Sequence, residues 1–170
     1  EFYGRKFIVT PDTLIPRPET EKIIEILKDY QPQGRLLDIG TGSGVIGTTA
    51  KLELPELSVT LSDISQGALV VARKNAKKLG AKPLHFVQSD LLEHWLSHAR
   101  PKPFDIIVAN LPYVDESWER SPETEYEPSG ALFAEDKGLA LIEKCILQST
   151  KLLSSSGLLL LEADPRQHNH

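Results

Sequence analysis

The 170-residue chain has little of several residue types, and each shortage excludes a class of protein. Its single cysteine, Cys145, excludes a disulfide framework and a cysteine-rich zinc module, and is typical of a reducing compartment such as the cytoplasm. No apolar run approaches the ~20 residues of a membrane-spanning helix, and no secretory signal pattern opens the chain. Methionine is absent altogether, so we expect the chain to be a fragment of a longer protein.

The chain also lacks an excess of positive charge. Its 19 Lys and Arg residues stand against 24 Asp and Glu residues, which gives a net charge of −5. This balance argues against affinity that rests on neutralising nucleic-acid phosphates, and we do not expect direct nucleic-acid binding. With 40% hydrophobic and 25% charged residues, the composition is that of an ordinary globular domain.

Strand-sized apolar runs alternate with helix-sized segments along the chain. The expected strands are residues 35–39, 58–62, 84–87, 104–109 and 157–162, and the expected helices are 44–53, 65–79, 90–99 and 137–153. This alternation predicts an α/β fold, with a doubly wound, mostly parallel sheet that has helices on both faces.

Two further segments flank this pattern. A helix is expected before the first strand, because Pro18 suits a first helical turn and Ile23, Ile24 and Leu27 form an apolar face. Ahead of it, Phe2–Thr10 alternates weakly and predicts a small extended element. A long segment, Asn110–Asp136, follows the fourth strand, and loops of that length are usually functional or disordered.

A glycine-rich motif, Asp38-Ile-Gly-Thr-Gly-Ser-Gly44, follows the first expected strand and opens a helix. Glycines permit a tight turn and a close approach of the backbone to a ligand, and the helix start presents free N–H groups. In a doubly wound sheet, cofactors bind at this end of the strands. The alternative is a plain glycine turn between a strand and a helix.

Acidic residues also end the next two expected strands. Asp63 lies about 20 residues after the glycine motif, where an acid commonly receives ribose hydroxyls, and Asp90 ends the third strand. Asp90 is equally suited to capping a helix. It also lies one turn before His94 and His98, but exposed helix positions explain these histidines and we expect no metal.

The glycines alone leave a second cofactor open. Gly42-Ser-Gly44-Val-Ile-Gly47 matches G-x-G-x-x-G, so from this motif alone the cofactor could also be a nicotinamide dinucleotide. The end of the fourth strand distinguishes them.

Asn110-Leu-Pro-Tyr113 follows the fourth strand directly, and that strand is expected beside the first. The amide oxygen of Asn110 and the backbone carbonyl of Leu111 can each accept one N–H of a planar NH2 group, on which Tyr113 can stack. Leu111 is biased toward extended backbone because it precedes Pro112. This arrangement is suited to catalysis by positioning. The alternative is a simple turn with a buried tyrosine.

Together these motifs resemble a class I S-adenosylmethionine-dependent methyltransferase with a Rossmann-like fold. The segments Phe7–Glu21, with its Ile-Pro-Arg-Pro-Glu-Thr-Glu run, and Tyr126–Gly138 are similar to the release-factor glutamine methyltransferases (the PrmC/HemK family). The similarity extends from Phe2 to Glu162. We therefore expect residues 1–170 to be the catalytic domain, with residues 1–17 leading into it and with an N-terminal helical domain and final strands absent.

The resemblance implies N5-methylation of the glutamine in the Gly-Gly-Gln motif of peptide chain release factors. The residues it implies for cofactor binding are Asp38, Gly40, Thr41, Gly42, Ser43, Gly44, Asp63, Asp90, Leu91 and Asn110. Those implied to hold the substrate amide are Asn110, Leu111, Pro112 and Tyr113. Arg17, Pro18 and Glu19 are implied to form a lid or wall beside the cofactor.

One departure keeps an alternative open. The family reads Asn-Pro-Pro-Tyr, whereas this chain has Leu111 in second place, and Asn-Leu-Pro-Tyr resembles the rRNA adenine N6-methyltransferases. The net charge and the two flanking segments favour the glutamine enzymes.

The last expected strand gives a further expectation. Without further strands beside it, Leu158–Leu161 would form an apolar sheet edge where association is expected.

Overall fold

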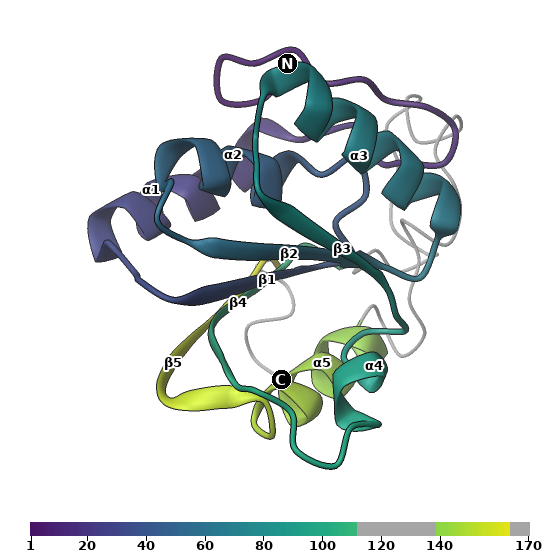
Figure 1. Cartoon of the computed structure of the whole chain (residues 1–170). Helices are drawn as coiled ribbons and strands as arrows, with labels where there is room; N and C mark the ends of the chain where they lie inside the picture. Colours follow the sequence, from purple (N-terminus) through teal and green to yellow (C-terminus); the bar gives the residue numbers. More distant parts are fainter. Residues whose placement is uncertain (112–138, 164–170) are drawn as a thin grey trace.

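A parallel sheet forms the centre of the computed structural model, which describes residues 1–111 and 139–163 (Figure 1). Its strands are β1 (Arg35–Ile39), β2 (Ser58–Asp63), β3 (Leu84–Gln88), β4 (Phe104–Ala109) and β5 (Leu153–Leu161). Their order is β3-β2-β1-β4-β5, and each neighbouring pair is parallel. The expected doubly wound sheet is confirmed, and the strand order reverses between β1 and β4.

Helices cover both faces of this sheet. In Figure 1, α1 (Glu21–Tyr30), α2 (Val45–Glu53) and α3 (Gln66–Leu79) lie on one side, and α4 (Glu93–Leu96) and α5 (Ala140–Ser149) lie on the other. Successive strand residues point to opposite faces. Leu36 accordingly belongs to the core under α1 and α2, whereas Leu37 belongs to the core beside α5.

Several boundaries differ from the sequence-based expectation. The helix expected at residues 90–99 is the single turn α4, because Leu91 turns the backbone at φ +44° just before it. The helix expected to end at residue 153 ends at Ser149, and β5 begins at Leu153, because the backbone N–H of Phe104 bonds the Leu152 carbonyl (2.7 Å) and brings the chain into the sheet. The expected extended element at 2–10 reduces to one bridge, between Phe2 and Arg5.

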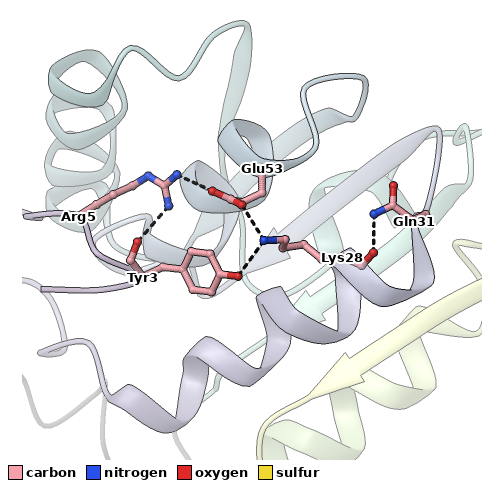
Figure 2. Close-up of polar contacts among 5 residues, drawn as sticks. All are labelled: Tyr3, Arg5, Lys28, Gln31 and Glu53. Atoms are coloured by element: carbon pink, nitrogen blue, oxygen red, sulfur yellow. Dashed lines mark hydrogen bonds and ion pairs between the residues drawn. The ribbon is translucent and has the colours of Figure 1, made fainter.

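The first residues are joined to α1 and α2 by a cluster of polar contacts (Figure 2). Arg5 and Lys28 both pair with the carboxylate of Glu53, at 2.5 and 3.1 Å. Lys28 also donates to the Tyr3 hydroxyl (3.2 Å). The hydrogen bond from Arg5, ahead of that from Lys28, keeps the pKa of Glu53 below its usual value. This cluster fixes the start of the chain against the helices that precede and follow β1.

The helix expected before the first strand is confirmed. A 3-10 turn, η1 (Pro18–Thr20), begins with the proline and continues into α1. The expected apolar face is buried, since Ile23, Ile24 and Leu27 are at most 6% exposed. Pro18 therefore begins a helical segment, and the buried apolar face of α1 holds η1 in place.

Strand β5 lies at one edge of the described sheet, and Leu158–Leu161 are half-buried there. Cys145 is fully buried in α5, although the neighbouring Ile146 is 41% exposed. None of the helices in residues 1–111 and 139–163 has the length and apolar character needed to cross a membrane.

Candidate active site at the carboxyl ends of the strands

A cavity of about 480 Å³ opens at the carboxyl ends of β1, β2 and β4. Its size falls within the roughly 300–1,000 Å³ of small-molecule sites. Nine of the residues predicted to bind the cofactor or the substrate amide line it: Gly40, Thr41, Gly42, Ser43, Asp63, Asp90, Leu91, Asn110 and Leu111. Asp38 and Gly44 are not among the described residues of its wall. Pro112 and Tyr113 lie outside the described residues.

The glycine motif forms a tight loop whose backbone is bonded on several sides. The N–H of Thr41 donates to the Ser62 carbonyl (2.9 Å), and that of Gly44 donates to the Thr41 carbonyl (2.8 Å). Gly40, Gly42 and Gly44 all have positive φ, between +54° and +80°. The loop therefore needs the left-handed backbone that glycine adopts without strain.

Asp38 lies beneath this loop and stabilises it. Its Oδ2 accepts from the Thr41 hydroxyl (2.5 Å) and from the backbone N–H of Gly47 (2.8 Å), while its Oδ1 has no partner among the described residues. The side chain is fully buried, and this burial raises its pKa to about 7. A direct contact between Asp38 and a cofactor stays a prediction.

The raised pKa predicts how stability depends on pH. The ordinary pKa of an aspartate is 3.8, so the unfolded chain has lost this proton above about pH 4. The folded protein keeps the proton up to about pH 7. The contribution of Asp38 to the free energy of unfolding therefore falls as pH rises through this interval. We expect Asp38→Asn, compared with the wild type by urea unfolding, to gain relative stability between about pH 5 and about pH 8. An identical difference at both pH values would contradict this assignment.

Gly44 is needed for packing between α2 and α3, because a Cβ there would lie 2.9 Å from the Cβ of Ala72 and 3.1 Å from its Cα. Gly42 is a matched control, since it also has positive φ but its Cβ would meet nothing within 4 Å. We expect Gly42→Ala to lower the free energy of unfolding by about 1–2 kcal/mol from backbone strain alone. Gly44→Ala should cost about 1–3 kcal/mol more through overpacking. Urea unfolding of both variants measures the difference, and equal losses would exclude the packing role.

Asp63 connects the end of β2 to the glycine loop. Its two carboxylate oxygens accept from the backbone N–H groups of Gly42 and Ser65, each at 2.9 Å. Burial raises the pKa of Asp63 in spite of these bonds, which act in the opposite direction. Each oxygen retains a lone pair, so the carboxylate can also accept hydroxyl protons from a ligand in the cavity.

Asp90 and Leu91 form the neighbouring part of the wall. The Asp90 carboxylate pairs with Lys144 of α5 (3.0 Å), which also pairs with Glu93 (2.9 Å). The expected capping role falls instead to Ser89, whose hydroxyl accepts from the backbone N–H of His94 (3.1 Å). The wall at this end of β3 is thus tied to α5 through a lysine.

Asn110 and Leu111 leave β4 into the same cavity. The Asn110 side chain is half-buried, and its Nδ2 donates to the hydroxyl of Thr20 at 3.0 Å. Leu111 is 5% exposed and belongs to the core beside α5. The structure therefore brings the end of β4 within one cavity with the glycine loop and Asp63.

The N-terminal segment supplies the outer wall, to an extent that the sequence did not indicate. Of the predicted lid residues, Arg17 lines the cavity, whereas Pro18 and Glu19 do not. The lining residues not predicted from the sequence on this side are Pro11, Asp12, Thr13, Leu14, Pro16 and Thr20. They come after Ile8 in the chain, which is held by Asn75. Asn75 is fully buried, and its Nδ2 donates to the carbonyls of Ile8 (2.9 Å) and Ser43 (2.8 Å).

The remaining chemistry-bearing residues lie elsewhere. His94 and His98 are exposed on and after α4, with the His98 ring 2.7 Å from the His94 carbonyl. No three His, Cys, Asp or Glu side chains in the described ranges are grouped as metal ligands would be. Lys74, Lys77 and Lys78 are exposed on α3, as expected of a solvated face.

The sheet order and a glycine loop at the carboxyl end of β1 define the Rossmann-like fold of class I methyltransferases. A methyltransferase from Pyrococcus furiosus shares it, with a TM-score of 0.66, 19% identity, and coverage of 94% of this chain and 69% of that one. An SAH-bound methyltransferase from Podospora anserina has a TM-score of 0.57 and 19% identity, covering 88% of this chain and 53% of that one.

The family follows from the sequence comparisons. Residues 18–124 match the methyltransferase small domain, and the chain belongs to that family. It is 40% identical over 168 residues to the release factor glutamine methyltransferase of Enterococcus faecalis, covering 95% of this chain and 58% of that protein. The chain thus spans about three-fifths of the length of such curated relatives.

Proposed function

We propose that this chain is the catalytic domain of a protein methyltransferase that transfers a methyl group from S-adenosylmethionine (SAM) to a glutamine side-chain amide. The observation that carries the proposal is the meeting of Asn110, Asp63 and the loop Gly40–Ser43 around one cavity. A cofactor-binding loop and an amide-binding asparagine in one cavity are what methyl transfer to a planar nitrogen requires.

The described residues fit the cofactor. Gly40–Ser43 line the cavity and would bring their backbone close to the ligand, and the buried carboxylate of Asp63 would accept from the ribose hydroxyls. Asp90 and the apolar Leu91 line the same cavity and would border the adenine. When bound, SAM supplies an electrophilic methyl group at a sulfonium sulfur.

The chain's own contribution is to orient the substrate amide. An amide nitrogen is a poor nucleophile because its lone pair is delocalised into the carbonyl group. The Oδ1 of Asn110 and the backbone carbonyl of Leu111 would accept the two N–H bonds, which favours a more pyramidal nitrogen and directs its lone pair. The methylated nitrogen is strongly acidic and loses its extra proton to water, so positioning is sufficient and no strong base is required. Stacking by Tyr113, next to Pro112, is part of the proposal on sequence grounds.

The proposed substrate is the Gly-Gly-Gln glutamine of peptide chain release factors. The support comes from relatives named release factor glutamine methyltransferase, which are about 40% identical and align with nearly the whole chain. Because that substrate is a protein, direct nucleic-acid binding is not part of the proposal. A cytoplasmic location is part of the proposal, and the free thiol of Cys145 agrees with it.

The test incubates the full-length protein with SAM and an unmodified release factor, followed by tandem mass spectrometry. We expect a methyl group on the Gly-Gly-Gln glutamine, which would also show that Leu111 is tolerated in place of proline. Parallel samples contain rRNA. Methyl-adenine there, with unmodified release factor, would overturn the proposal in favour of an rRNA adenine N6-methyltransferase. A titration with NAD alongside SAM checks the nicotinamide alternative.

A further inference from the structure

Thr20 contacts the side chain of Asn110, although 90 positions separate them in the sequence. The Asn110 Nδ2 donates to the Thr20 Oγ1 at 3.0 Å. Thr20 is 2% exposed and lines the same cavity as Asn110. The proposed function gives this threonine no role.

The backbone around Thr20 keeps its hydroxyl in place. Thr20 ends η1 and immediately precedes α1, and its N–H donates to the Arg17 carbonyl (3.2 Å). The next turn of α1 buries Ile23 and Ile24 against the sheet. The hydroxyl is therefore presented to Asn110 from a packed helix start.

A primary amide has two chemically opposite ends. The oxygen only accepts hydrogen bonds and the NH2 group only donates them. An asparagine that binds the NH2 group of a substrate must present its oxygen, because the reversed amide would place two donors against each other. The rotation of the terminal amide is soft, so the choice depends on the partners of each end.

We propose that Thr20 is a positioning residue that holds the Asn110 amide in the orientation that the structure shows, with Nδ2 on the Thr20 hydroxyl. Its hydroxyl accepts from Nδ2 and so leaves Oδ1, which diverges from the same carbon, to accept from the substrate. This inference rests on the proposed function of Asn110, and it assigns a task to the threonine of the Ile-Pro-Arg-Pro-Glu-Thr-Glu run.

The test compares Thr20→Val, which keeps the shape of the side chain without the hydroxyl, with Thr20→Ser, which keeps the hydroxyl. In the full-length protein we expect Thr20→Val to lower kcat for glutamine methylation by about 10–100-fold, because misplacement of the acceptor costs on that order. The SAM Kd should stay within about two-fold, and Thr20→Ser should restore most of the rate. In an Asn110→Ala background, Thr20→Val should cause no further loss, since it acts through that side chain.

A second readout does not depend on activity. In the ¹⁵N–¹H spectrum, the side-chain NH2 signals of Asn110 should shift in Thr20→Val and keep their positions in Thr20→Ser. Thr20→Ala replaces the valine variant in both measurements if the latter does not fold. Unchanged kcat, equal damage by valine and serine, or unmoved Asn110 signals would each overturn the inference. Absence of glutamine methylation in the wild type would instead overturn the proposed function, and the spectrum would still test the Thr20–Asn110 contact.

Discussion

Replacement of Asn110 by alanine should lower kcat for methyl transfer by about 10²–10³-fold, the range seen when one preorganised hydrogen-bonding group is removed from a catalytic site. The expected loss is large because Asn110 supplies one of only two proposed acceptors for the substrate NH2 group. The fold should survive, since the side chain is half-buried and its one described bond is to Thr20. Single-turnover methylation of the release factor measures the effect.

Gln88→Ala is the matched control for this variant. It also removes an amide at the end of a strand, but Gln88 is exposed and does not line the cavity, and the described bond of its side chain is to the Ile64 carbonyl. We expect it to retain the wild-type rate. Near-normal transfer by Asn110→Ala would refute the amide-positioning mechanism, and an equal loss in both variants would point to general damage at the sheet edge.

The parts of the fold that were predicted correctly depend on short-range patterns. Each strand core is a run such as Phe104–Ala109, whose alternating side chains enter two cores, and the glycine motif has the spacing of a strand-to-helix turn. The start of β5 was missed because Ser154–Ser156 has the composition of a loop. Its place in the sheet depends on pairing with β4, which no local pattern specifies.

The predicted site was incomplete for a related reason. Asp63 ends β2 and Asn110 directly follows β4, so the parallel sheet alone places them together. Thr20 is brought to the site by a contact with a residue far along the chain, and its neighbours in the sequence do not reveal that partner. Asn75 did carry a signal, because it lies on the buried face of α3 between Ala72 and Ala76. A polar residue at such a position indicates a buried hydrogen-bonding task.

Replacement of Asp63 by alanine should raise the Kd for SAM by about 10–100-fold, the equivalent of one hydrogen bond to a charged group. Asp63 is 9% exposed as a residue, so bulk water competes little for its carboxylate oxygens. Calorimetric titration of SAM into both proteins measures the change, and an unchanged Kd would exclude the ribose role.

The same carboxylate also bonds the backbone of Gly42 and Ser65, so weaker binding has a second explanation, a loosened glycine loop. A SAM analogue without ribose hydroxyls separates the two. If Asp63 binds those hydroxyls, their removal weakens binding to the wild type but causes little further loss in Asp63→Ala, because contacts to one partner are not additive. An equal penalty in both proteins would assign Asp63 to the loop alone.

Burial also raises the pKa of Asp63 above its ordinary value of 3.8. As the solution is acidified, the affinity of the wild type for SAM should therefore begin to fall while the pH is still above 3.8. Asp63→Ala should lack this pH dependence.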